Sequence, residues 1–398
     1  MATVLPFRAL RPAPDHAEHV ASVPYDVVDT AEARALAEGR PTSFLHVIRP
    51  EIDLPEGTDE HDDRVYAQGA ETLQRFAESD AFLTEEEPAF YVYRLVMDGR
   101  AQAGIFGLVT VAEYDDDTIL KHENTRPDKE DDRTRHIVTQ RAHAEPVMLT
   151  YRGTPALDAL TEEAMTGVPL YAFTAADGVR HEVWRMPNAP AVEEAFAHVP
   201  KLYVADGHHR SAAASRAATE LPDHPEAAAF MAVLFPVEQM LILPYNRVVY
   251  KLPGGPRAFL DVLRKRFDLT DHVRPQPAEP GYVSLYLDGV WYGLELPETE
   301  RGSVADTLDV ARLGEHLLEP MLGITDPRTD PNIGFVGGIR GTDELERLVD
   351  GGRAELAISM HATSPEELLA VSDAGQLMPP KSTWFEPKLR SGLLIHRF

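Results

Sequence analysis

The chain has 398 residues, of which 43% are hydrophobic and 26% are charged, and its formal net charge is −27 at pH 7. This length allows two or three soluble domains, and no window approaches the roughly 20 apolar residues of a membrane span. Because cysteine is absent, disulfides, thiolate catalysis and cysteine-ligated metal centres are excluded. Residues 1–13 lack the basic-then-apolar order of a signal peptide, so we expect a cytoplasmic protein.

The net negative charge also limits which partners the protein is expected to bind. An acidic surface repels phosphate backbones over a Debye length of about 10 Å. The longest cation-rich stretch, residues 126–141, also carries several acidic residues, which is typical of a solvated helix. The sequence therefore predicts neither a nucleic-acid partner nor a membrane partner, and it does not indicate an oligomeric state.

Helical and strand patterns alternate along the first 250 residues, which predicts mixed α and β structure. We expect a helix at 30–37, an apolar strand at 43–48 and an amphipathic helix at 59–78. The elements expected next are a hairpin at 89–114, a short strand near Ile119, a helix at 129–143, a strand at 146–150, helices at 157–165 and 191–197, and between these two helices a hairpin at 169–186.

The loop after the strand near Ile119 reads Lys121-His-Glu-Asn-Thr-Arg126. A carboxylate just past a strand end can be poised as a general base, and Glu123 occupies that position. On spacing alone, however, an exposed loop in which Lys121 and Arg126 are its salt-bridge partners is the favoured interpretation.

The most informative segment is Leu202-Tyr-Val-Ala-Asp-Gly-His-His-Arg210. A buried strand over 202–204 and a helix from Ser211 place Asp206 and Gly207 in the turn between them. A helix start can hold an anion, Arg210 can grip phosphate oxygens, and Asp206 can hold Mg²⁺ or orient a nucleophile.

Two other interpretations also fit this turn. Asp-Gly also marks ordinary hairpin turns, which we expect at 98–99, 177–178 and 288–289, but here an alanine-rich helix follows instead of a second strand. Asp206 and the two adjacent histidines could also ligate zinc, although zinc ligands on one helix usually stand at i and i+4.

After strands at 228–236 and 240–249 the pattern changes, and we place a domain boundary near residue 250. A second α+β region, 251–398, is expected, whose last segment could fold back onto the first. Its expected elements are helices at 257–267, 304–322, 343–349 and 365–371, a hairpin at 282–296 and a strand at 355–360.

The terminal stretch Met378-Pro-Pro-Lys-Ser-Thr-Trp-Phe385 offers a compact set of phosphate or carboxylate donors at residues 381–383. An aromatic pair that anchors a strand explains the same stretch equally well. No Walker motif occurs anywhere in the chain.

Four motifs together resemble a widespread bacterial family that is classed as a domain of unknown function. They are Val23-Pro-Tyr-Asp-Val27, Lys121-His-Glu-Asn-Thr125, Asp206-Gly-His-His-Arg210 and Met378-Pro-Pro-Lys-Ser-Thr383. Members are similar to free-serine kinases, whose core resembles the nucleotide-binding domain of ParB partition proteins and sulfiredoxins. The resemblance implies an α+β fold of mixed sheets with flanking helices, in which residues 1–250 contain the ParB-like core and the catalytic region.

The resemblance also implies phosphoryl transfer from ATP or ADP to the hydroxyl of free L-serine, with Mg²⁺ as cofactor. Carried over by position, it overturns the exposed-loop interpretation of Glu123. The implied residues are Glu123, Asp206 and His209 for catalysis, with Asp206 also the Mg²⁺ ligand, and Gly207, His208, Arg210 and Ser211 for the nucleotide phosphates. From their own side-chain chemistry, Lys381, Ser382 and Thr383 are added as candidates for binding substrate or phosphate.

Three alternatives remain open at this point. The protein could be a non-catalytic, ParB-like nucleotide-binding switch, a kinase of another small alcohol, or a metal hydrolase that uses the acid and histidine residues of the two motifs. The sequence does not indicate whether ATP or ADP is the phosphoryl donor, because no motif in it distinguishes a nucleoside triphosphate from a diphosphate.

Overall fold

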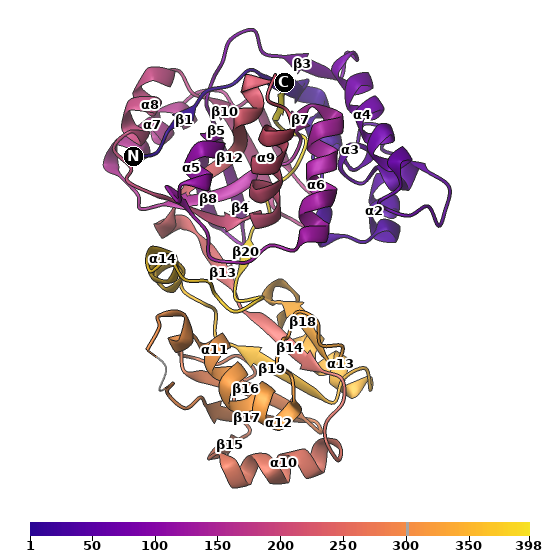
Figure 1. The fold of residues 1–398 in the computed structure, drawn as a ribbon, viewed down its shortest axis with the longest axis vertical. Helices are drawn as coiled ribbons and strands as arrows, with labels where there is room; N and C mark the ends of the chain where they lie inside the picture. The colour runs from indigo at the N-terminus through magenta and orange to yellow at the C-terminus, as the bar shows by residue number, and fades with distance from the viewer. Residues whose placement is uncertain (300–301) are drawn as a thin grey trace. The chain divides into compact units, whose positions relative to one another are not determined.

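The computed structural model describes residues 1–299 and 302–398 (Figure 1). By packing, the chain divides into two units. The first comprises residues 1–121, 125–240 and 387–398, and the second comprises 122–124 and 241–386. Both contain sheets with flanking helices, which confirms the expected α+β class. The domain boundary near residue 250 stays a prediction.

The first unit is built on a nine-stranded sheet with the order β6-β11-β8-β12-β5-β4-β10-β9, in which β1 also pairs with β5. The β6–β11 and β8–β12 pairs are parallel, and the other pairs are antiparallel. The strands are β1 (Val4–Leu5), β4 (Tyr91–Met97), β5 (Arg100–Thr110), β6 (Ile119–Leu120), β8 (Val147–Tyr151), β9 (Tyr171–Thr174), β10 (Arg180–Arg185), β11 (Leu202–Asp206) and β12 (Ala229–Pro236).

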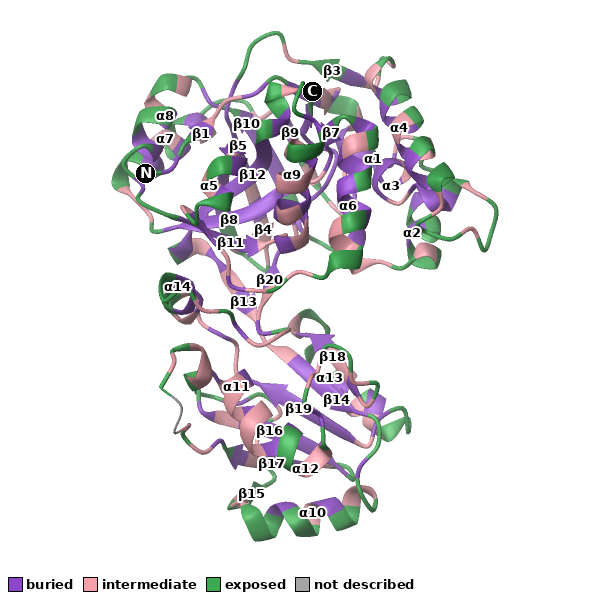
Figure 2. Cartoon of the chain, in the orientation of Figure 1, coloured by how far each residue is buried: buried purple, intermediate pink, exposed green. Residues whose placement is uncertain are grey.

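Helices bury their apolar faces against this sheet, whose central strands are largely buried (Figure 2). The alanine-rich helix α9 (His208–Glu220) packs through small side chains, because Ala213, Ala214 and Ala217 are all buried in the core. Small residues let a helix approach a sheet closely. The other helices near this sheet are α5 (Val111–Asp115), α6 (Pro127–Gln140), α7 (Pro155–Met165) and α8 (Ala189–Phe196).

A four-stranded sheet joins the two ends of the chain within the first unit. Its order is β3 (Phe82–Thr84), β2 (Ala9–Pro12), β21 (Ile395–Arg397) and β7 (Ala142–His143). Between β2 and β3 the chain forms the helices α1 (Ala17–Val20), α2 (Thr30–Ala37), α3 (Leu45–Ile48) and α4 (Asp63–Ala77).

The strand expected at 43–48 is wrong, because this segment forms helix α3. Its apolar run is too short for periodicity to separate a buried strand from a buried helix. Tertiary contacts decide instead: the amide of Leu45 donates to the hydroxyl of Ser22, 3.2 Å away, and Leu45, Val47 and Ile48 are buried.

The second unit contains a six-stranded sheet, β15-β17-β16-β19-β14-β18, and the pair β13–β20. Its strands are β13 (Leu241–Leu243), β14 (Tyr245–Val249), β15 (Leu269–Asp271), β16 (Tyr282–Leu287), β17 (Val290–Glu295), β18 (Ile333–Gly337), β19 (Leu356–Met360) and β20 (Trp384–Glu386). Its helices are α10 (Gly255–Arg266), α11 (Asp309–Leu313), α12 (Glu319–Leu322), α13 (Gly341–Asp350) and α14 (Pro365–Asp373).

The single helix expected at 304–322 is divided into a 3₁₀ turn, α11, a π-helical turn at Gly314–Leu318 and α12. Gly314 weakens a helix and Pro320 cannot donate its backbone hydrogen bond, so both disfavour a regular ladder here. The hairpin turns expected at 98–99 and 288–289 are confirmed, since all four of their residues have positive φ.

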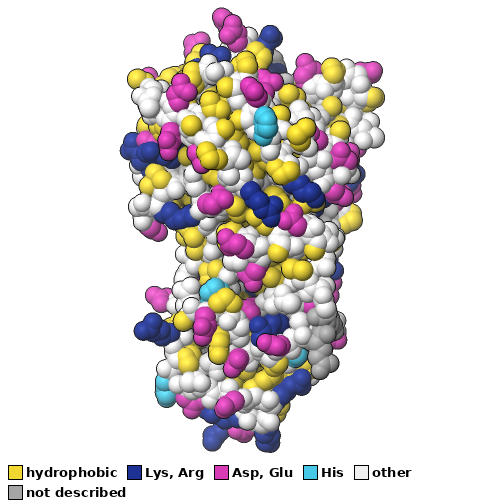
Figure 3. All heavy atoms as spheres, turned by 90° about the vertical axis from the view of Figure 1, so that its left-hand side faces the viewer, with side chains coloured by type: hydrophobic (Ala, Val, Ile, Leu, Met, Phe, Trp, Pro, Cys, Tyr) yellow, Lys and Arg dark blue, Asp and Glu magenta, His cyan; other side chains and the backbone are white. Residues whose placement is uncertain are grey.

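Acidic and basic side chains are interspersed on the face of the molecule shown in Figure 3. Within the described ranges, 1–299 and 302–398, no helix combines the length and the apolar character that crossing a membrane requires.

Candidate functional site

The turn between β11 and α9 places the Asp206-Gly-His-His-Arg210 motif at the start of a helix. Gly207 has φ 107°, a left-handed conformation that strains other residues, and an added Cβ would lie 3.1 Å from Nε of Arg210. The N-cap residue Gly207 has no side chain that could cap this helix, and the start of a helix carries the positive end of its dipole, which attracts an anion. Ser211 is fully buried, and its hydroxyl donates to the Gly207 carbonyl, which fixes the turn.

Asp206 keeps a negative charge at this turn. Its carboxylate accepts a hydrogen bond from Nζ of Lys388, 2.9 Å away, and lies 3.5 Å from Nη2 of Arg210. Burial raises the pKa of Asp206, but the Lys388 ammonium and the Arg210 guanidinium outweigh burial and hold this pKa well below its usual range. The side chain is still 24% exposed, so the ionised carboxylate remains accessible.

Sequence reasoning missed Lys388. It follows the motif that ends at Thr383, yet 182 positions separate it from Asp206, and no local spacing rule links two residues so far apart. Only the packing of residues 387–398 with the first unit brings the two together.

Arg210 is buried and has partners of its own. Its Nη1 donates to the carbonyl of Pro146, and Nη2 approaches Asp206. Burial lowers the pKa of Arg210, but nearby carboxylates, Asp206 first among them, raise it above its ordinary value, so the guanidinium stays charged. These contacts support a role in fixing Asp206. The phosphate contact expected for Arg210 stays a prediction.

A buried ion pair beside Pro146 connects this turn to the Val23–Val27 motif. The carboxylate of Glu145 accepts from the amide of Tyr25 at 3.2 Å and lies 3.3 Å from Nη1 of Arg133. Arg133 in turn lies over the Tyr25 ring, 3.9 Å from its centroid. Burial raises the pKa of Glu145, and the two nearby arginines offset this increase only in part.

The two segments that flank residues 122–124 belong to the first unit and lie beside the turn. The loop that carries Glu123 leaves β6, whose residues Ile119 and Leu120 pair in parallel with β11, so both strands end at the same edge of the sheet. It ends at Arg126, whose amide donates to Nε2 of His209 at 3.1 Å. Neutral His209 therefore carries its proton on Nδ1.

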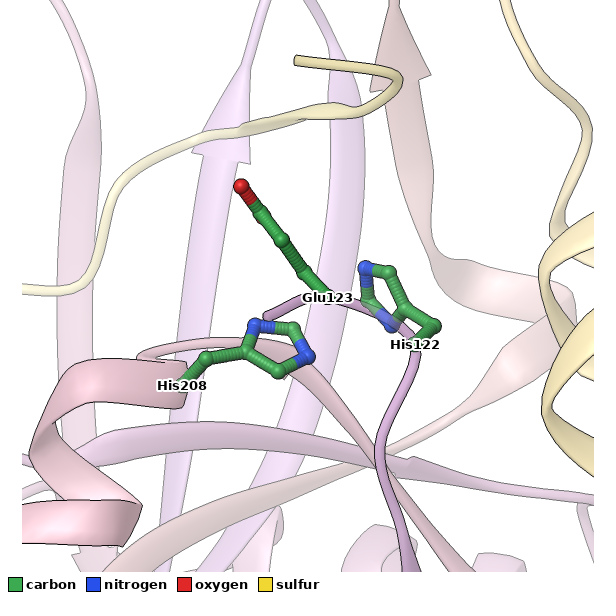
Figure 4. Close-up of side chains that lie close together, drawn as sticks. All are labelled: His122, Glu123 and His208. Atoms are coloured by element: carbon green, nitrogen blue, oxygen red, sulfur yellow. The ribbon is translucent and has the colours of Figure 1, made fainter. Parts of the chain in front are cut away.

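Figure 4 shows three side chains with the segments that carry them: His122 and Glu123 from this loop and His208 from the first position of α9. Imidazole nitrogens and carboxylate oxygens are donors that a divalent cation can use. By their packing, His122 and Glu123 belong to the second unit and His208 to the first.

The three residues expected as donors, 381–383, lie in the second unit, where Lys381 and Ser382 make structural contacts. The carbonyl of Lys381 accepts from Nη2 of Arg247 at 2.9 Å, and the hydroxyl of Ser382 donates to the carbonyl of Pro379 at 2.6 Å. Thr383 precedes β20, which pairs with β13. A substrate role for these residues stays a prediction.

Comparisons with known proteins give one family and several weak structural similarities. The profile of a family described as "protein of unknown function (DUF1015)" matches residues 4–311. None of the curated proteins matches the chain.

Among solved structures, SbnI with a C-terminal truncation from Staphylococcus aureus is 13% identical, with 73% of this chain and 87% of that chain covered and a TM-score of 0.40. A free serine kinase mutant in complex with AMP is 11% identical, with 73% and 91% covered and a TM-score of 0.39. A conserved hypothetical protein from Pyrococcus furiosus is 12% identical, with 73% and 95% covered and a TM-score of 0.37.

Proposed function

Because the chain belongs to the DUF1015 family, whose function is unknown, we propose a function from its own residues. The protein is a cytoplasmic, Mg²⁺-dependent kinase that transfers a phosphoryl group from ATP or ADP to the hydroxyl of free L-serine. The observation that carries the phosphotransferase is the ionised Asp206, held by Lys388 and Arg210 at the start of α9. The choice of serine and of a ParB-like core rests on the motif resemblance.

This turn suits a nucleotide phosphate because phosphoryl transfer depends mainly on positioning and on charge stabilisation. The positive end of the α9 helix dipole and the left-handed turn at Gly207 favour phosphate oxygens at this position. The ammonium of Lys388 adds a positive charge beside them. In this arrangement His208 and His209 stabilise charge on the transferred group.

The low pKa of Asp206 makes it a poor proton acceptor and a good cation ligand. Its carboxylate oxygens retain acceptor capacity beyond the contacts to Lys388 and Arg210, which fits a hard, oxygen-preferring ion. Asp206 would hold Mg²⁺, which neutralises phosphate charge when it is bound.

Glu123 is then the base. The serine hydroxyl gives its proton to the Glu123 carboxylate while a bond forms between the serine oxygen and the phosphorus atom. The bond from that phosphorus to the bridging oxygen breaks, so that ATP leaves as ADP, or ADP leaves as AMP. Serine becomes O-phospho-L-serine.

The test is direct detection of the product. The purified full-length chain is incubated with MgCl₂ and L-serine, with ATP and ADP in separate reactions, and O-phosphoserine is measured by mass spectrometry. We expect product with at least one donor. No product from either donor despite measurable nucleotide binding would favour the switch, or another small alcohol as acceptor. Zinc that survives purification would favour the hydrolase, because Mg²⁺ exchanges readily.

A further inference from the structure

A pocket of about 300 Å³ lies within the second unit, and Glu123 lines it together with Asn124, Asp306, Arg328 and Met378. This volume is at the small end of the range for ligand sites. The pocket therefore combines the proposed base with one further carboxylate, one guanidinium and one amide.

Hydrogen bonds between distant segments hold the walls of this pocket in place. The amide of Met378 donates to the carbonyl of His122 at 2.7 Å, which joins the Glu123 loop to the terminal motif. The amide of Ala305 donates to the side-chain oxygen of Gln376 at 3.0 Å, which joins the Asp306 turn to the same segment. Three of the chain segments that line the pocket are thus tied together, and Arg328 comes from a fourth segment.

The guanidinium of Arg328 is anchored but not saturated. Its Nε and Nη2 each donate to Asp326 at 3.0 Å, and in residues 1–299 and 302–398 no hydrogen bond engages its Nη1. Asp326 raises the pKa of Arg328, and Glu123 adds a smaller effect of the same sign. Arg328 therefore offers a fixed positive charge to the ligand.

Asp306 offers the opposite charge. Its Oδ2 accepts from the hydroxyl of Ser303 at 2.6 Å, while Oδ1 accepts no hydrogen bond from the part of the chain that the structure describes. The remaining walls are apolar or small, and they come from residues 305, 311, 377, 379 and 380.

We infer that this pocket binds the acceptor as a small zwitterionic amino acid, whose α-carboxylate pairs with Arg328 and whose α-ammonium pairs with Asp306. An alcohol without an ammonium group would leave Asp306 unpaired, and a polyanion would meet two carboxylates, Asp306 and Glu123. The small apolar walls favour a short side chain. The inference rests on the proposed function for the role of Glu123, and it adds the residues that bind the two charged groups of the acceptor.

Calorimetric titration of the full chain without nucleotide tests this assignment, because it requires no turnover. We expect L-serine and L-alanine to bind, and L-serine amide and N-acetyl-L-serine to bind at least about tenfold more weakly. Arg328→Gln should weaken L-serine binding by a similar factor and remove the discrimination against the amide. Asp306→Asn should likewise weaken L-serine binding, and it should remove the discrimination against N-acetyl-L-serine.

The matched control is Arg347→Gln, because Arg347 forms a similar exposed pair with Glu344 on α13. Arg347→Gln should bind L-serine as wild type does, and every variant should bind ADP as wild type does. Circular dichroism establishes that each variant folds. L-serine binding that is unaffected by both pocket variants would overturn the inference even if O-phosphoserine is formed, as would a wild-type chain that binds no amino acid. The predicted binding pattern without phosphotransfer would support the inference and contradict the proposed kinase.

Discussion

Asp206 stays ionised in a partly buried turn because Lys388 and Arg210 together outweigh the cost of its burial. A carboxylate whose folded pKa lies below its unfolded value stabilises the fold at neutral pH. This contribution is fully present above pH 4, near the unfolded pKa, and is lost as the pH falls through the folded pKa.

Lys388→Met removes the closer of these two cations. We expect the free energy of unfolding at pH 7 to fall by roughly 1–3 kcal/mol, less than for a fully buried pair because both side chains keep some exposure. The difference from wild type should shrink as the pH is lowered from 4 toward 2, since the variant Asp206 binds its proton at a higher pH. Urea denaturation at several pH values measures this.

Lys201→Met is the control for this prediction, because Lys201 is exposed in the same unit. It should change stability by less than about 0.5 kcal/mol. A Lys388→Met deficit that does not depend on pH would show that the ammonium does not lower the pKa of Asp206.

Gly207 has a backbone conformation and a close neighbour, Arg210, that both disfavour a side chain at this position. Gly207→Ala should cost roughly 1–2 kcal/mol from the left-handed backbone alone, and it should weaken ADP binding because the new Cβ presses on Arg210. Gly39→Ala separates the two effects, since Gly39 also has positive φ but no atom within 4 Å of an added Cβ. If both variants lose the same stability and bind ADP like wild type, the contact with Arg210 has no role.

At the scale of elements, the segment 202–220 was predictable because every local signal agrees. A buried apolar strand, an Asp-Gly turn and an alanine-rich helix follow one another without conflict, and the structure contains all three. The segment 43–48 was not predictable, because its short apolar run fits two structures and packing decides. The network of Tyr25, Arg133 and Glu145 was likewise out of reach, since its members lie on separate elements.

The terminal strand β21 gives the element-scale prediction. It lies between β2 and β7, and Ile395 is fully buried. Ile395→Ala should lower the free energy of unfolding by about 2–5 kcal/mol through lost burial and a residual cavity. Thermal and chemical denaturation measure this loss, and Val168→Ala, at a position 92% exposed, should have little effect. A loss below about 1 kcal/mol would mean that the terminal segment is not part of the core.

At the scale of the molecule, the alternating helical and strand patterns of the sequence predicted the α+β class. They did not predict the order of the strands within the sheets. Pairings such as β2 with β21 join residues near opposite ends of the chain, and no short-range pattern encodes them. The same limit hid Lys388 from sequence reasoning, whereas the motif residues at 206–211 were found because they are contiguous. The ParB-like core and the domain boundary near residue 250 remain predictions.

The most direct test of the proposed kinase is Mg²⁺-dependent formation of O-phosphoserine by wild type and by Glu123→Ala. We expect wild type to form product, EDTA to abolish it, and Glu123→Ala to lose turnover while its ADP affinity stays close to that of wild type. Glu71→Ala, which removes an exposed carboxylate on α4, should keep full activity. Near-normal turnover in Glu123→Ala would contradict the assignment of the base, and no product from wild type with either nucleotide would contradict the serine kinase itself.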